Sequence, residues 1–199
     1  MSRVVVVSSV TLDGVMQAPA RPDEDRRGGF EHGGWALPYN DAVMAERMGQ
    51  GMAQGGALLL GRRTYEDFYR VWPSRTGNPF AEVLNNSRKY VASTTLAEPL
   101  PWSNSTLLKG DVAQAVTTLR QQPGQDLVIL GSGALIGLLM RYHLIDEFVL
   151  LIHPLVLGSG QRLFPDGVAV ALRLAGSVTT TTGVVIATYQ PAGPMPEIA

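Results

Sequence analysis

The sequence predicts an α/β domain in which helices cover both faces of a mostly parallel sheet and an antiparallel hairpin forms one edge. Short runs of apolar residues, such as 4–7, 57–60 and 127–130, are typical of strands that are buried on both faces. Helical patterns alternate with these runs through most of the chain, as in parallel βαβ units. After residue 147 only strands are predicted, and a short turn separates the last two, which indicates the hairpin.

The first predicted elements surround a long loop. Val4–Val7 is predicted to be a buried strand because its residues are β-branched and continuously apolar. Residues 11–38 follow; they are rich in Gly, Pro, Asp and Arg and lack periodicity. A segment of this length is usually functional or disordered, and its part from Asp23 to Trp35 is interpreted as either a mobile lid over the substrate or a flexible surface loop. Asn40 or Asp41 is then expected to cap a helix that ends at Gly55-Gly56.

The remaining elements continue the alternation of strands and helices. They are, in order, a strand at 57–60, a short helix capped by Thr64, a helix near 78–86, strands at 89–93 and 106–108, a helix capped by Asp111, a strand at 127–130, a helix that ends near Tyr142, and strands at 147–152, 171–178 and 184–189. Residues 1–190 are therefore predicted to form one domain, and the proline-rich residues 191–199 a flexible tail.

Composition excludes several classes of protein. The chain has 199 residues with a net charge of −1 and no block of like charge, which argues against a nucleic-acid partner. It has no cysteine, so disulfides and thiolate chemistry are excluded, and its 3 histidines lack the spacing of metal ligands. The apolar runs are too short to span a membrane, and the apolar start is interpreted as a strand rather than a signal peptide. The predicted compartment is the cytoplasm.

Three motifs follow three predicted strands. They are Gly61-Arg62-Arg63-Thr64, Ser93-Thr94 and Gly131-Ser132-Gly133-Ala134-Leu135. Because ligands bind outside the carboxyl ends of strands in open α/β sheets, we expect the motifs to face one crevice. Glycine turns before helices and arginine side chains both suit phosphate groups. Each motif alone is equally typical of a tight turn or a solvated loop, but together they predict a ligand with several phosphates.

With Ser9–Gly14, these motifs resemble those of the dihydrofolate reductase superfamily. Leu144–Phe148 and His153–Gly160 resemble the branch that includes the reductase domain of the bifunctional riboflavin-biosynthesis deaminase-reductase. The resemblance covers residues 4 to about 190, as expected for a stand-alone member. It implies the three-layer αβα fold of dihydrofolate reductase.

The resemblance also implies that NADPH is the cofactor. The residues that match cofactor-binding positions of the family are Gly14, Gly61, Arg62, Arg63, Thr64, Ser93, Thr94, Gly131, Ser132, Gly133, Ala134 and Leu135. Arg62 or Arg63 would pair with the 2′-phosphate and favour NADPH over NADH. The turn at 131–135 would bind the pyrophosphate.

The substrate side is predicted from the segment Trp35–Asn40, which resembles the W-x-L-P-x-D segment of folate-reducing members. Asn40 takes the place of the family's acid, and Asp41 follows it. We therefore assign Asp13, Trp35, Asn40 and Asp41 to the substrate side, while helix capping remains an alternative for Asn40 and Asp41. The predicted reaction is hydride transfer to a C=N or C=O group of a small pterin-, pyrimidine- or ribosylaminouracil-like heterocycle.

Two rival functions and one assembly state remain open. Asn40 at the acid position motivates a non-catalytic NADP(H)-binding protein that has lost turnover. The glycine turn also suggests a Rossmann-type dehydrogenase, although its spacing, G-x-G-x-x-x-G, differs from that fingerprint. We expect a homodimer because apolar strands lie near the carboxyl end of the chain and because the riboflavin branch that the chain resembles is typically dimeric.

Overall fold

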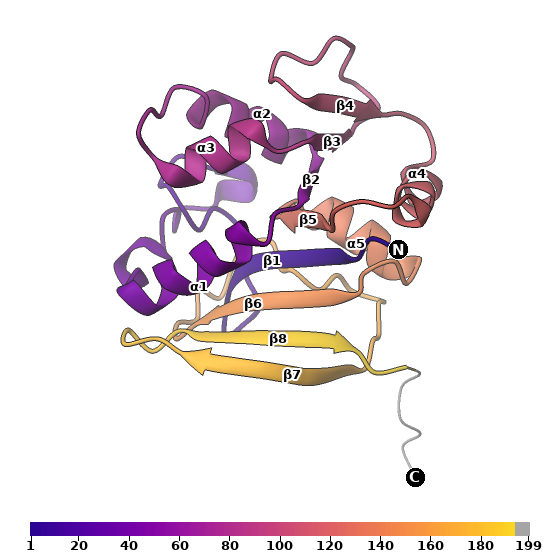
Figure 1. The fold of residues 1–199 in the computed structure, drawn as a ribbon. Coiled ribbons are helices and arrows are strands. Elements are labelled where there is room, and N and C mark those ends of the chain that lie inside the picture. Colours follow the sequence, from indigo (N-terminus) through magenta and orange to yellow (C-terminus); the bar gives the residue numbers. More distant parts are fainter. Residues whose placement is uncertain (194–199) are drawn as a thin grey trace.

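The computed structural model describes residues 1–193 and contains one eight-stranded sheet (Figure 1). Its strands are β1 (Val4–Thr11), β2 (Ala57–Gly61), β3 (Lys89–Ala92), β4 (Ser105–Leu108), β5 (Leu127–Leu130), β6 (Glu147–His153), β7 (Leu172–Thr179) and β8 (Val185–Pro191). The order across the sheet is β4-β3-β2-β5-β1-β6-β8-β7, from the top to the bottom of Figure 1. The first six strands in this order, from β4 across to β6, are parallel to one another. Strands β8 and β7 add an antiparallel edge, which confirms the predicted mixed sheet.

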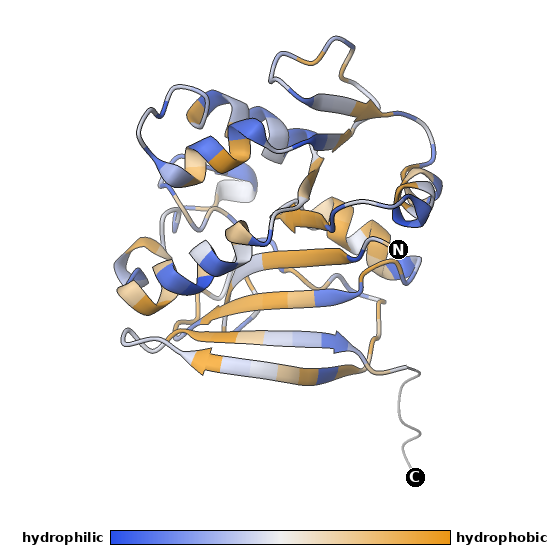
Figure 2. Cartoon of the chain, in the orientation of Figure 1, coloured by the Kyte–Doolittle hydropathy of each residue, from blue (hydrophilic) through white to orange (hydrophobic). Residues whose placement is uncertain are grey.

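Five α-helices cover the two faces of this sheet. They are α1 (Ala42–Ala53), α2 (Arg62–Val71), α3 (Pro79–Asn86), α4 (Val112–Gln121) and α5 (Gly133–Arg141). Helices α4 and α5 pack with the central strands in one hydrophobic core, whereas α2 and α3 pack on the other face. Strand β2 shows the division directly, because Leu59 belongs to the first core and Leu58 and Leu60 to the second. Figure 2 shows the resulting concentration of hydrophobic residues in β1, β5 and β6.

The start of each helix separates the five helices into two groups. Asp41, Asn78 and Asp111 accept hydrogen bonds from backbone amides in the first turns of α1, α3 and α4, so these helices are capped by side chains. Helices α2 and α5 have no side-chain cap. Their first backbone N–H groups therefore remain available to a ligand.

Two predicted boundaries were wrong for physical reasons. Thr64 does not cap α2, because β2 passes directly into the helix and Arg62 is already helical. Strand β1 extends past Val7 to Thr11, because pairing with β6 continues as far as Thr11 and His153. The ladder of backbone hydrogen bonds outweighs the polarity of the residues in this extension.

The carboxyl end leaves the sheet at β8, which runs to Pro191. The predicted flexible tail at 191–199 lies partly outside the described residues, because 194–199 are not described. Within residues 1–193, no helix has the length and hydrophobicity needed to cross a lipid bilayer.

Candidate functional site

A cavity of about 1050 Å³ opens at the carboxyl ends of β1, β2, β3 and β5. Because β3, β2 and β5 are neighbours in the sheet, the three motifs that follow them meet at this edge. Every predicted cofactor residue except Gly14 lines the cavity. The opposite wall comes from the loop at residues 16–27.

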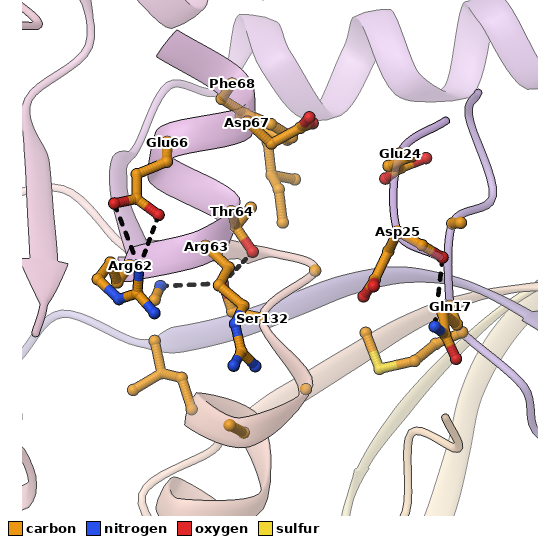
Figure 3. A pocket seen from close by; sticks show the side chains of 18 of the residues that line it. Gln17, Glu24, Asp25, Arg62, Arg63, Thr64, Glu66, Asp67, Phe68 and Ser132 are labelled. Carbon is orange, nitrogen blue, oxygen red and sulfur yellow. Dashed lines mark hydrogen bonds and ion pairs between the residues drawn. The ribbon is translucent and has the colours of Figure 1, made fainter. Parts of the chain in front are cut away.

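The two glycine turns are joined by Ser132. Its Oγ accepts a hydrogen bond from the Gly61 amide at 2.9 Å and donates one to Thr64 Oγ1 at 2.8 Å (Figure 3). Gly131 and Ser132 both have positive φ, 72° and 69° respectively. Ser132 therefore adopts a conformation that costs a non-glycine residue energy, and its two hydrogen bonds hold the starts of α2 and α5 together.

Ser132→Ala is expected to lower the free energy of unfolding by about 1–2 kcal/mol, because it removes both hydrogen bonds and keeps the strained φ. Ser132→Gly also removes the bonds but suits a positive φ, so it is expected to cost less. Chemical denaturation of the two variants measures the difference. A larger loss for glycine than for alanine would contradict this account.

Charged side chains divide the cavity into paired and unpaired groups. Arg62 Nη1 lies 3.0 Å from Glu66 Oε2, in an i,i+4 pair on the surface of α2. Arg21 reaches across from the loop to Asp67 at 2.5 Å. Arg63 is exposed at the start of α2 and has no carboxylate partner within residues 1–193. Arg63 is thus free to meet an anion, whereas Arg62 must leave Glu66 first.

The residues at this edge fit the phosphates of a nicotinamide dinucleotide. Two uncapped helix starts offer backbone N–H groups and a favourable dipole to a pyrophosphate. Arg62 and Arg63 add charge beside them for a further phosphate. Ser93 Oγ already accepts bonds from the amides of Thr95 and Leu96, so its hydroxyl can only donate to a ligand.

The wall formed by residues 16–27 is fixed by Gln17. This buried side chain donates to the Arg27 carbonyl at 3.0 Å and accepts from the Gln161 amide at 2.9 Å. Trp35 Nε1 donates to the Gln17 carbonyl at 2.7 Å. The long loop therefore carries its own buried contacts and forms one side of the cavity.

None of the four residues predicted on the substrate side lines the cavity. Trp35 is buried against His153, at 5.1 Å between ring centroids, and Asn40 is exposed. Asp41 caps α1 and also accepts from Thr181 in the β7–β8 turn, so its position fits the capping alternative. Gly14 lies in the turn after β1, where its carbonyl accepts from the Leu163 amide.

Asp13 instead secures the turn after β6. Its carboxylate accepts from Thr11 Oγ1 at 2.6 Å and from the Gly158 amide at 2.9 Å. The Thr11 hydrogen bond, followed by those from Gly158 and Leu157, lowers the pKa of Asp13 to about 2. The carboxyl group is ionised throughout the neutral range, which suits an acceptor and not a proton donor.

The lowered pKa of Asp13 predicts a specific acid sensitivity. Because the folded-state value of about 2 lies below the ordinary 3.8, the stabilisation is complete above pH 3.8 and is lost as pH falls toward 2. Asp13→Asn is expected to flatten the dependence of thermal stability on pH across this window. An unchanged slope in the variant would show that Asp13 does not contribute.

Sequence patterns did not identify the residues of the loop wall. Arg21, Glu24 and Gln17 lie in an aperiodic segment, and no spacing in the sequence points to the cavity. Their composition, rich in charge and glycine, left a mobile lid and a flexible surface loop as equal alternatives. Their roles depend on contacts with α2 and with residues near Gln161.

Comparison with known proteins identifies the family and the fold. The model of the RibD C-terminal domain matches residues 2–186. The chain is 27% identical over 192 residues to the uncharacterized protein YyaP of Bacillus subtilis, covering 94% of each chain.

Three solved structures share the architecture. A Shewanella protein assigned to riboflavin biosynthesis is 21% identical with a TM-score of 0.70, covering 97% of this chain and 100% of that chain. A pyrimidine reductase-like protein of Corynebacterium diphtheriae is 12% identical with a TM-score of 0.67, covering 97% and 93%. Dihydrofolate reductase of Enterococcus faecalis, complexed with NADP(H), is 14% identical with a TM-score of 0.59, covering 96% and 97%. The predicted dihydrofolate reductase-like fold is confirmed.

Proposed function

Because the chain belongs to the RibD C-terminal domain family, which supports a reductase-type function, we propose that it is an NADPH-dependent reductase of a small heterocyclic compound. The proposed reaction reduces a C=N or C=O group of a pterin-, pyrimidine- or ribosylaminouracil-like substrate. One observation supports it most strongly: two uncapped helix starts and two arginines meet at one edge of the sheet.

The chain's own residues have distinct roles in this proposal. The backbone amides at the starts of α2 and α5 bind the pyrophosphate, and Arg62 and Arg63 bind the 2′-phosphate. Ser132 keeps the two helix starts at a fixed separation through Gly61 and Thr64. When bound, the cofactor supplies hydride, and the protein aligns it with the substrate and limits access of water.

Titration with NADPH and NADH, followed by tryptophan fluorescence, tests the cofactor site. We expect micromolar binding of NADPH and weaker binding of NADH. Loss of NADPH absorbance with 7,8-dihydrofolate and with a ribosylaminouracil then tests turnover. No binding of either nucleotide would overturn the proposal.

A non-catalytic NADP(H)-binding protein is the second candidate. It is favoured by the placement of Asp13, Trp35, Asn40 and Asp41 outside the cavity. Tight NADPH binding without oxidation across both substrate classes would select it over the reductase.

We also propose that β7 pairs with a second copy of the chain. This edge strand is exposed along most of its length, and Leu174 and Val178 are 51% and 36% exposed. An edge strand of this kind presents unpaired backbone groups to another strand. Light scattering should give a dimer mass at micromolar concentration, and a monomer mass would reject the homodimer.

A further inference from the structure

We propose that Glu24 is the proton donor of the reductase site, an inference that rests on the proposed function. Reduction of a C=N group needs a proton at nitrogen as well as hydride at carbon. The cavity must therefore supply an acid at neutral pH or admit one from water.

The side chains that line the cavity leave few candidates. Within the described residues, its lining includes no His, Lys, Tyr or Cys. Its acidic residues are Glu24, Asp25, Glu66 and Asp67. Among the described residues that line the cavity, a protonated carboxyl group is therefore the side-chain acid best suited to donate a proton.

Three of these four carboxylates are paired with arginine. Asp25 pairs with Arg27, Glu66 with Arg62, and Asp67 with both Arg21 and Arg70. The Arg27 side chain lowers the pKa of Asp25, which makes this carboxyl group a poor proton donor. The carboxylates of Glu66 and Asp67 are already occupied by arginine side chains. Glu24 forms no ion pair within residues 1–193, so it differs from the others in the same cavity.

The geometry of Glu24 leaves one oxygen for chemistry. Oε2 accepts hydrogen bonds from the amides of Ala20 at 2.7 Å and Arg21 at 3.2 Å, which fix the carboxyl group in the loop. Within the described residues Oε1 has no hydrogen-bond donor. Figure 3 shows Glu24 on the wall of the cavity opposite the start of α2.

The surroundings of Glu24 raise its pKa. Burial, and to a smaller extent the charge of Asp67, raise the pKa of Glu24 above the ordinary 4.5, while Arg21 and the two amide bonds act in the opposite direction. The charged groups that face it are Arg21 on its own loop and Asp67 on α2. Arg21 and Arg70 both contact the same oxygen of Asp67, so both arginines are ion-paired with Asp67 and not with Glu24.

The proposed step is balanced. The O–H bond of Glu24 breaks and an N–H bond forms on the substrate nitrogen, whose electron pair comes from the former C=N double bond. The carbon gains hydride from the cofactor, which is oxidised as the substrate is reduced. The Glu24 carboxylate then takes a proton from water.

Glu24→Gln is the main test, because the amide oxygen can still accept from Ala20 and Arg21 while the side chain can no longer donate an acidic proton. Glu46→Gln, on the exposed surface of α1, is the matched control. Carboxyl resonances are recorded after labelling with ¹³C-glutamate, and the resonance of Glu24 is the one that is missing from Glu24→Gln. In the wild-type protein we expect this resonance to titrate above pH 4.5 and to shift on addition of NADPH. Titration at or below 4.5, or no response to NADPH, would overturn the assignment.

Kinetics separate this assignment from the proposed function. With 7,8-dihydrofolate or the ribosylaminouracil as substrate, Glu24→Gln is expected to reduce kcat about 100-fold and to remove the fall in kcat that accompanies deprotonation of Glu24 as pH rises, with the Kd for NADPH unchanged. A wild-type protein that oxidises NADPH while Glu24→Gln retains its rate and pH profile would overturn only the role of Glu24. A wild-type protein that binds no NADPH would overturn both.

Discussion

Replacing both Arg62 and Arg63 with alanine is expected to weaken NADPH binding about 100-fold and to leave NADH binding nearly unchanged. Charge-assisted hydrogen bonds to a phosphate contribute about 1.5–3 kcal/mol, and only NADPH carries the 2′-phosphate. Fluorescence titration with both nucleotides measures the ratio of the two effects. That ratio is informative because it removes any general loss of folded protein.

The single variants should differ in size. Arg63 has no carboxylate partner within residues 1–193, whereas Arg62 must give up Glu66 before it meets a phosphate. Arg63→Ala is therefore expected to cost more than Arg62→Ala. Arg47→Ala, on the exposed face of α1, serves as the control. Equal weakening of NADPH and NADH would assign the arginines to the pyrophosphate instead.

The crevice was predictable because it depends on short sequence motifs at the ends of strands, which the parallel sheet brings together. Gly61 ends β2, and Ser93 and Gly131 directly follow β3 and β5; parallel strands bring their carboxyl ends to one edge of a sheet. The sequence cannot state which strands are neighbours, but any arrangement with parallel β2, β3 and β5 places these turns together. The family resemblance predicted a dinucleotide ligand for the crevice. The structure adds that the helices α2 and α5, which start there, have no side-chain caps.

The substrate side was harder to predict because a carboxylate has two common uses. Asp13 and Asp41 both stand near the predicted site in sequence, yet their oxygens bind backbone amides and hydroxyls of the turn after β6 and of the β7–β8 turn. Those partners lie more than a hundred residues away, so no local spacing reveals them. Glu24 is the opposite case, because its loop has no sequence pattern that points to a site. Only the folded chain brings Glu24 opposite α2.

The same dependence on distant partners explains the error at Thr64. A threonine after a glycine turn is a reasonable helix cap by its residue type. Here its hydroxyl accepts from Ser132, 68 positions later, and the helix begins at Arg62. Because β2 passes directly into α2, the extended residue at the N-cap position is Gly61, and Thr64 already lies in the first turn of the helix.

The opposite end of the sheet is expected to depend strongly on Lys89. This fully buried side chain donates from Nζ to the carbonyls of Asn85 (3.1 Å), Ser87 (2.8 Å) and Ser103 (3.1 Å). It also lies 4.4 Å from the ring centroid of Trp102. Lys89→Met is expected to lower the free energy of unfolding by about 3 kcal/mol, because three carbonyl groups lose their donor in a site without access to water.

Chemical denaturation of Lys89→Met and of Lys109→Met, an exposed control, measures this difference, and the control should change by less than about 0.5 kcal/mol. The pH dependence gives a second readout. Burial lowers the pKa of Lys89 from 10.5 to about 8, so the unfolded chain holds more protons between these values and wild-type stability should rise from pH 8 to 10.5. Lys89→Met should lack this rise. If Lys89→Met and wild type show the same slope, the ammonium group of Lys89 keeps its ordinary pKa. In that case the three carbonyl groups and the Trp102 ring stabilise the charge as well as water does.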